Sequence, residues 1–325
     1  MQSNSTASAL SKLPVVCLLA TISCLLWGSA FPCVKLGYEL FEVNLQHIPS
    51  ILLFAGMRFT LAGILTILIG SVLSRRPLIP HQGHTFRHIM ILAMLQTIIQ
   101  YFFFYIGLAH TTGVKASIIG GANAFVALLI ASLLFHQESL TPRKLLGCII
   151  GFAGVVLVNL NQGGLGGGFQ FTGEGFVFLS TVSAALSATC LRKFGAEDHP
   201  VLLSGWQFFC GGIVLILTGL AGGGHVAAPT PQGALMLFYL GCISAVAYSL
   251  WGILLKHNPV SRITVLGFMT PIFGVILSAV FLKEFNQAMG ATTAGALLLI
   301  CLSIFFVNST SEKENLQTTS GRELP

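Results

Sequence analysis

The stretch that decides the fold runs from Val114 to Asn159 and has the sequence VKASIIGGANAFVALLIASLLFHQESLTPRKLLGCIIGFAGVVLVN. Its first part, up to Phe135, is apolar and long enough to cross a bilayer as a helix. A charged joint follows, and a second apolar run begins at Leu145. The first run and its joint recur 146 positions later, which indicates a chain of two related halves. The matching residues are Val114 and Val260, Gly121 and Gly267, Ile130 and Ile276, Ser132 and Ser278, Phe135 and Phe281, and Glu138 and Glu284.

Composition sets the class of protein. Hydrophobic residues make up 54% of the chain and charged residues 8%, whereas soluble proteins carry about 25% charged residues. Backbone groups in lipid must bond to each other, so apolar runs of about 20 residues without period-two alternation are expected to be helices. Ten such runs are predicted, at 13–36, 48–72, 87–109, 114–135, 142–160, 172–191, 200–222, 231–255, 261–282 and 287–308.

The distribution of cations predicts the orientation. Cationic residues gather in cytoplasmic loops. With the N-terminus inside, the inner loops and tails hold twelve Lys and Arg residues, and the outer side holds three. This split predicts that both termini are cytoplasmic, and it explains the net charge of +6 without nucleic-acid binding. The inner residues are Lys12, Arg75, Arg76, Arg87, Arg143, Lys144, Arg192, Lys193, Lys256, Arg262, Lys313 and Arg322, and the outer ones are Lys35, Lys115 and Lys283.

Five helices in each half is an odd number, so the second half must be inverted relative to the first. The predicted fold is an all-α integral membrane protein with ten transmembrane helices in two inverted five-helix repeats. The repeats span 13–160 and 172–308, joined by a Gly-rich outer linker at 161–171 and flanked by cytoplasmic tails at 1–12 and 309–325. Inverted repeats are the architecture of secondary transporters, whose substrate site lies near the midplane between the halves.

Arg58 is the most informative single residue, because it lies about ten residues from either end of its span. An arginine at the membrane centre is expensive and faces a cavity or a partner. Two interpretations stay open: Arg58 binds an anionic group of the substrate, or it clamps carbonyl groups of neighbouring helices. The second half repeats this frame 149 positions later with Gln207 in place of the arginine.

Further polar and aromatic residues within the spans are candidates for a substrate cavity. Trp27 and Ser29 lie before a mid-membrane proline, and the alternative for them is a packing seam of small residues. For the others, the alternative is interhelical hydrogen bonding and an aromatic core. The predicted substrate-binding residues are Trp27, Arg58, Gln100, Asn123, Trp206, Tyr248 and Trp251.

Other motifs favour structural roles. The loop histidines His81, His84 and His88 have no cysteine or carboxylate beside them in sequence, which favours a solvated loop over a metal site. Thr141 is expected to cap the helix that follows, with Glu138 stabilising the joint near the positive end of that helix. The glycine run at 163–168 lacks the frame of a nucleotide-binding loop. No catalytic residue, metal or cofactor is predicted.

The sequence resembles the drug/metabolite transporter superfamily, and specifically its ten-helix members made of two EamA-like repeats. The resemblance covers about residues 13–308. Two departures are Ala124-Phe125 where a proline is usual, and a second repeat shortened between Glu284 and Gly290. The resemblance implies export of amino acids, related metabolites or toxic compounds by alternating access. It rests on Trp27-Gly28-Ser29-x-Phe31, Arg58-Phe59, Phe135-x-x-Glu138-x-x-Thr141 with Gly147, Gly151 and Gly154, and a second copy with Pro271, Phe281 and Glu284.

The predicted function is therefore a secondary transporter that exports a small metabolite, an amino acid or a related amphipathic compound. An importer, a facilitative exchanger and a non-transporting receptor or scaffold remain alternatives, whereas an enzyme is not expected because no catalytic set lies at one depth. The expected partners are a small-molecule substrate and the lipid bilayer, with no nucleic acid. Proton coupling stays open because no acidic residue lies mid-membrane, and a monomer and a homodimer are both compatible with the sequence.

Overall fold

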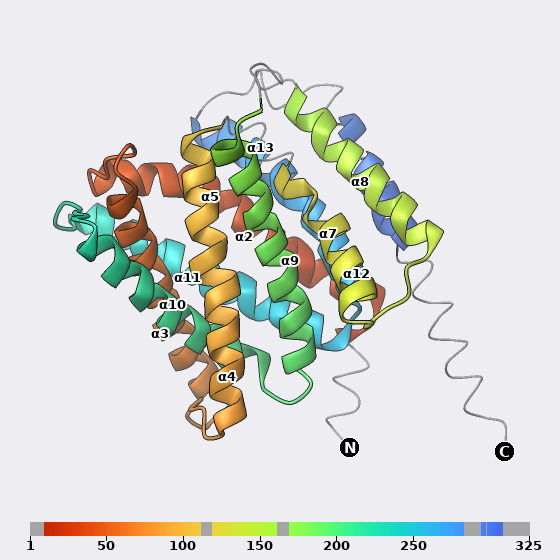
Figure 1. Cartoon of the computed structure of the whole chain (residues 1–325), viewed down its shortest axis with the longest axis horizontal. Coiled ribbons are helices and arrows are strands. Elements are labelled where there is room, and N and C mark those ends of the chain that lie inside the picture. The colour runs from red at the N-terminus through yellow and green to blue at the C-terminus, as the bar shows by residue number, and fades with distance from the viewer. Residues whose placement is uncertain (1–9, 112–118, 161–168, 283–293, 297, 308–325) are drawn as a thin grey trace.

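The computed structural model describes residues 10–111, 119–160, 169–282, 294–296 and 298–307 (Figure 1). All regular secondary structure in these ranges is helical, as predicted. Six of the described helices are long and apolar enough to cross a membrane, judged by length and composition. They are α2 (Leu13–Leu40), α3 (Ile48–Leu73), the compound helix Gly83–Gly107, the compound helix Phe171–Phe194, α10 (Pro200–Ala221) and α11 (Pro231–His257).

The remaining described helices are shorter or irregular. α8 (Pro142–Leu160) begins at the predicted proline, and three apolar helices of 10–17 residues cover Ile119–Leu134, Val260–Gly274 and Ala294–Val307. Parts of the predicted spans 114–135 and 287–308, together with Glu284 and most of the predicted linker, lie outside the described residues.

Several spans change their helical winding part-way. π-helical turns occur at η1, η2 and η3, and a 3₁₀ turn at η4. Neither kind of turn is predicted by apolar run length, which sets only where a span begins and ends. The compound helices are α4 (Gly83–Leu92), η1 (Ala93–Ile99) and α5 (Gln100–Ala109); α7 (Asn123–Leu129) and η2 (Ile130–Leu134); η3 (Phe171–Gly175) and α9 (Phe176–Phe194); and α12 (Val260–Thr264), η4 (Val265–Phe268) and α13 (Met269–Leu282).

The outward surface carries large apolar side chains. Val72 and Leu73 are 76% and 80% exposed, and Leu18, Leu217 and Leu235 are also mostly exposed. Exposed apolar surface on this scale is a liability in water. Contact with lipid acyl chains accounts for these side chains, as expected for spans that cross a bilayer.

The closest helix pair is α3 with α10, which pack along a seam of glycines. A Cβ atom added to Gly63 would lie 2.4 Å from the backbone nitrogen of Phe209, and one added to Gly212 would lie 2.5 Å from that of Thr60. Gly56 likewise lies against the backbone of α10. Only glycine permits backbones to approach this closely. The seam glycines recur every seven residues, at Gly56 and Gly63 on α3 and at Gly205, Gly212 and Gly219 on α10.

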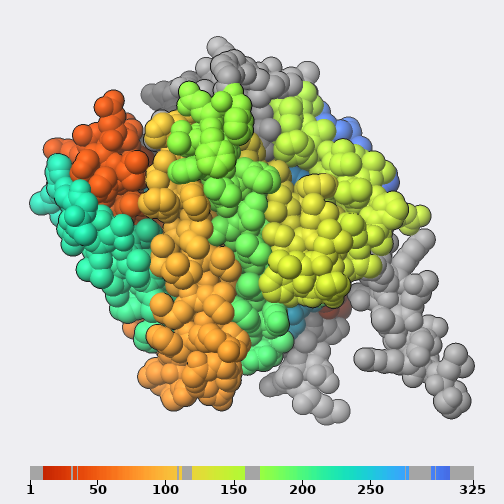
Figure 2. Space-filling model, in the orientation of Figure 1, coloured from red at the N-terminus to blue at the C-terminus, as the bar shows by residue number. Residues whose placement is uncertain are grey.

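Figure 1 shows how the other helices surround this pair. The compound helix of α4, η1 and α5 lies beside α9 on the face toward the viewer, with α3 and α10 at one edge and α8 at the opposite edge. In the space-filling view, side chains of α5 and α9 meet and cover the centre of the molecule (Figure 2). The centre, where polar and aromatic side chains gather, is therefore covered on this face.

Candidate functional site

Arg58 lies in the middle of α3 and is 6% exposed. Its Nη2 donates a hydrogen bond of 3.0 Å to the hydroxyl of Ser244 on α11, and its Nε is buried without a hydrogen-bond partner. The guanidinium also lies 5.3 Å from the ring centre of Phe59. A buried charge held by one neutral hydroxyl is incompletely compensated, and a central arginine costs about 2.5–3.5 kcal/mol on insertion scales.

Tyrosines surround this charge. The hydroxyls of Tyr101 on α5 and Tyr248 on α11 are 2.8 Å apart, which is a hydrogen bond between the two halves of the chain. The positive charge of Arg58 acts electrostatically on both of them, and on Tyr38 and Tyr105. Phenolic hydroxyls are polar but carry no charge, so these tyrosines do not neutralise the guanidinium.

Trp27 joins the same group from α2. Its indole ring packs edge-on against Tyr248 at 5.0 Å and against Trp251 at 4.9 Å. The indole Nε1 is buried and has no hydrogen-bond partner. A buried indole N–H ordinarily finds an acceptor, so this donor is available to a ligand. We call the group of Trp27, Arg58, Phe59, Tyr101, Phe208, Tyr248 and Trp251 the central cluster.

Equivalent positions of the two halves meet in the central cluster. Phe59 and Phe208, 149 positions apart, stack at 5.4 Å. Tyr101 and Tyr248, which share a hydrogen bond, are 147 positions apart. Each half therefore contributes the same residue type at each of these contacts, from helices that correspond in the repeat.

The polar contacts of α3 and α10 obey the same relation. Arg58 binds Ser244, and Gln207 accepts a hydrogen bond of 2.8 Å from Thr97 of η1. Thr97 and Ser244 are again 147 positions apart. The Gln207 amide also donates to Gln96 at 3.3 Å. Two equivalent interhelical bonds therefore exist, one made by a charged side chain and one by a neutral amide.

The structure brings four of the seven predicted site residues together and separates three. Trp27, Arg58, Tyr248 and Trp251 belong to the central cluster, whose described contacts do not include the others. Gln100 opens α5 directly after the π turn and is partly exposed. Asn123 opens α7, and its Oδ1 is buried without a hydrogen-bond partner.

Trp206 has a different role. Its indole donates a hydrogen bond of 2.7 Å to the carbonyl of Leu78 and ties α10 to the segment after α3. Its ring also lines an apolar surface groove of about 150 Å³ with Ile64, Leu68 and Phe209. The predicted set of seven omits Phe59, Tyr101 and Phe208 of the central cluster, as well as Ser244 and Thr97, the hydrogen-bond partners of Arg58 and Gln207. Aligning the halves at an offset of 149 pairs Phe208 with Phe59. An offset of 147 pairs Tyr101 with the predicted residue Tyr248, and it pairs Thr97 with Ser244.

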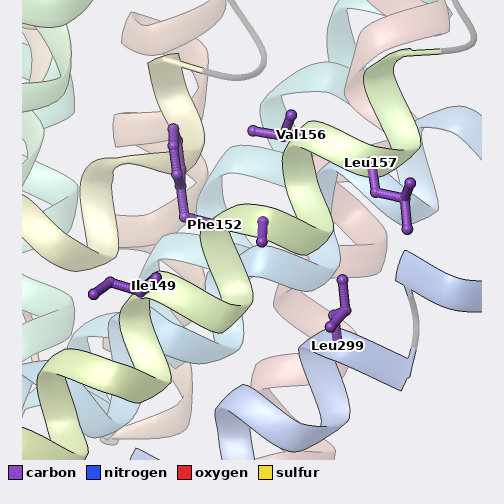
Figure 3. Close-up of a pocket in the computed structure, with 6 residues that line it drawn as sticks. Ile149, Phe152, Val156, Leu157 and Leu299 are labelled. Carbon is purple, nitrogen blue, oxygen red and sulfur yellow. The ribbon is translucent and has the colours of Figure 1, made fainter.

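A larger groove lies away from the central cluster. It has a volume of about 430 Å³ between α8 and the helix Ala294–Val307 (Figure 3). Ile149, Phe152, Leu157 and Leu299 are among the residues that line it, and all of its lining side chains are hydrocarbon. Such a lining offers no group to orient a polar ligand. A lipid acyl chain fits this chemistry better than a metabolite does.

Glu138 makes a second polar cluster, at the predicted cytoplasmic side. The carboxylate accepts a hydrogen bond of 3.0 Å from the backbone N–H of Ser261 and another from its hydroxyl, and it pairs with Lys144 at 3.2 Å. The sequence-based expectation placed Glu138 at the helix that follows it. The contact with Lys144 agrees with that, but the carboxylate also caps α12, a helix of the other half. Glu138 therefore links the two halves.

Asp198 anchors a third polar cluster. It accepts hydrogen bonds of 2.7 Å from the hydroxyl of Thr85 and pairs at 2.7 Å with Nδ1 of His88, whose ring stacks on Phe194. The interpretation of the histidines as a solvated loop is therefore wrong for His88, which is 4% exposed. The carboxylate partner lies 110 positions away, too far for the sequence alone to suggest it. Among the described residues, no group of three or more His, Cys, Asp or Glu side chains is arranged to hold a metal ion.

Membrane-spanning helices from both halves that enclose an arginine, tyrosines and tryptophans define a membrane protein with a buried polar site. The family model of the EamA-like transporter family matches residues 14–160 and again residues 171–309. The chain belongs to this family. It is a membrane transporter within the drug/metabolite transporter superfamily and not an enzyme.

Curated relatives agree with this assignment. An uncharacterized transporter of Archaeoglobus fulgidus is 31% identical over 296 residues, which cover 86% of this chain and 96% of the relative. A protein of Salmonella typhimurium named "Probable amino-acid metabolite efflux pump" is 26% identical over 300 residues, covering 87% of this chain and 91% of the relative. A solved crystal structure, 20% identical, matches with a TM-score of 0.73 over 90% of this chain and 98% of that chain, which supports the fold.

Proposed function

We propose that this transporter is a secondary carrier that exports a small amphipathic metabolite, an amino acid or a related compound, by alternating access. The observation that carries the proposal is the central cluster. It lies between helices of both halves and holds two buried donors, Arg58 Nε and Trp27 Nε1, that have no protein partner. Secondary carriers bind substrate at this kind of interface. The name of the Salmonella typhimurium relative supports amino-acid metabolites as the substrate class and efflux as the direction.

The proposal includes the architecture predicted from the sequence: ten helices in two inverted repeats, at 13–160 and 172–308, in a bacterial inner membrane with cytoplasmic termini. Contacts between equivalent residues support the inversion. Phe59 with Phe208 and Tyr101 with Tyr248 meet as pairs expected to lie on a pseudo-two-fold axis. In the transporter folds built from inverted-topology repeats, such an axis lies in the membrane plane.

Release of labelled compounds from proteoliposomes tests the function. Vesicles loaded with a panel of labelled amino acids and their derivatives are expected to release one class faster than protein-free vesicles do. An imposed pH gradient separates proton-coupled export from exchange or facilitation. Trp27→Phe removes the free indole donor and should slow release several-fold, whereas Phe305→Leu, on the exposed outer surface, should leave it unchanged. Equal release from protein-free and protein-containing vesicles for every compound would refute the proposal.

A further inference from the structure

Arg58 and Gln207 occupy equivalent positions in the two halves. Comparing their contacts shows whether the link between the halves requires a charged side chain. Both reach a hydroxyl on the other half, Ser244 for Arg58 and Thr97 for Gln207. Gln207 is fully buried, and both polar atoms of its amide are bonded, the second to Gln96. A neutral amide therefore suffices to link the halves at this depth. The charge of Arg58 serves something other than the link.

That charge has no anionic partner in the described structure. The buried carboxylates Asp198 and Glu138 contact His88 and Lys144, and their described contacts do not include Arg58. The described contacts of the guanidinium are the Ser244 hydroxyl and the Phe59 ring, and neither carries a charge. Buried charges are otherwise paired. The unpartnered Nε of a side chain that is more than nine-tenths buried is thus a vacant anion-binding donor.

The same cluster offers nothing to bind an ammonium group by charge. The described acidic residues lie at the ends of spans or in the joints, and none contacts the central cluster. Glu39 is exposed at the end of α2, Glu138 and Asp198 are committed to the contacts described above, and Glu174 receives hydrogen bonds from Thr111 and the backbone of Gln170. A cation would meet ring faces and phenolic hydroxyls beside the positive charge of Arg58. One guanidinium also matches one negative charge rather than a di- or triphosphate.

We propose that Arg58 binds the carboxylate of a monoanionic organic acid, and that the apolar body of this acid packs on Trp27, Tyr248 and Trp251. The recognised class is a carboxylic acid whose amino group is absent or acylated, in preference to a free zwitterionic amino acid or an amine. Arg58 Nε and Trp27 Nε1 supply N–H donors, and carboxylate–guanidinium bonds are among the strong hydrogen bonds of proteins. The inference rests on the proposed function, because it names the substrate class of the same site.

Binding to purified protein tests the proposal without transport. Intrinsic tryptophan fluorescence of the wild-type chain in detergent is titrated with three compounds that share a phenyl ring: 3-phenylpropanoate, phenylalanine and phenethylamine. The acid is expected to bind saturably, the zwitterion at least about 10-fold more weakly, and the amine not at all. The expected factor follows from the strength of a hydrogen bond to a charged group.

Variants locate the effect. Arg58→Gln copies the side chain that the protein itself uses at the equivalent position, and it should weaken binding of 3-phenylpropanoate about 10- to 100-fold. Arg58→Lys should restore part of the affinity, and Arg76→Gln, which removes an exposed cation elsewhere, should change nothing. If Arg58→Gln does not fold, the order of the three compounds on the wild-type protein still decides.

Several results would overturn the proposal: amine binding as tight as that of the acid, acid binding unchanged in Arg58→Gln, or no saturable binding of the acid at millimolar concentration. The experiments distinguish a wrong assignment of the substrate class from a wrong assignment of the transport function. Acid-selective binding with no export from proteoliposomes would refute the carrier and leave this assignment standing. Export of zwitterionic amino acids with no acid selectivity would do the reverse.

Discussion

The ion pair between Glu138 and Lys144 should contribute to stability by an amount that follows from the burial of both side chains. The side chains are 3% and 1% exposed, so both charges are removed from solvent. Removing one partner of a buried ion pair costs about 3–5 kcal/mol, because the other charge is left uncompensated. Glu138→Gln keeps an oxygen for the N–H of Ser261 but removes the negative charge that pairs with the buried Lys144 and also acts on Arg192. We expect a loss near 3 kcal/mol in the free energy of unfolding.

A double-mutant cycle separates the pair from its surroundings. Lys144→Met should cost less, about 1–3 kcal/mol, since Glu138 keeps both hydrogen bonds from Ser261. The double variant removes both charges and should lose at least about 1 kcal/mol less than the sum of the single losses. Unfolding in mixed micelles of a mild detergent and dodecyl sulfate measures all three, with Glu197→Gln, an exposed carboxylate, as the control. Strict additivity of the two single variants would contradict the reasoning.

Three further predictions concern the glycine seam and the joint between α9 and α10. Gly63→Ala must force α3 and α10 apart and should lower the free energy of unfolding by about 1–3 kcal/mol. Gly83 has open space around it, so Gly83→Ala should have no such effect. Equal effects of the two variants would exclude the seam as the cause. Asp198→Asn should destabilise the protein in the same assay by about 1–3 kcal/mol, because the carboxylate accepts from two side chains of α4. Burial and the positive charges of Lys256 and Arg76 lower the pKa of His199, so protonation of this histidine favours the unfolded chain. The free energy of unfolding should therefore fall as the pH drops through about 6.5. Thermal unfolding between pH 7 and 5 should show a smaller fall in His199→Gln.

Span positions were predictable because one physical quantity, the thickness of the hydrocarbon core, sets them. The predicted run 142–160 coincides with α8, whose start is marked by Thr141 and Pro142. The hydroxyl of Thr141 accepts from the backbone N–H of Lys144 at 3.4 Å, as expected for a cap. The π turns η1 and η2 were not predictable, because a change of winding inside an apolar run depends on the neighbouring helices rather than on local composition.

The site was predictable in part for a related reason. Arg58 and Trp27 could be singled out because their side chains are exceptional within an apolar span. Trp206 is equally conspicuous in sequence, but the run around it does not show which side of α10 faces the centre, and its indole binds Leu78 instead. Asp198, the partner of His88, lies in the loop between α9 and α10, so no local sequence pattern contains both residues. Contacts between distant segments need either the structure or an accurate alignment of the two halves.

The glycine seam between α3 and α10 limits how the molecule can change shape. Gly63 and Gly212 bring backbone directly against backbone, with no side chain between them that could adopt another rotamer. Separating the two helices would open a void along the contact, and sliding them would drive residues that do have side chains into the neighbouring backbone. These two helices are therefore expected to move together as one rigid body. In the proposed alternating-access cycle, the motion that exposes the central cluster to each side in turn is therefore expected in the helices packed around α3 and α10, which stay fixed relative to each other.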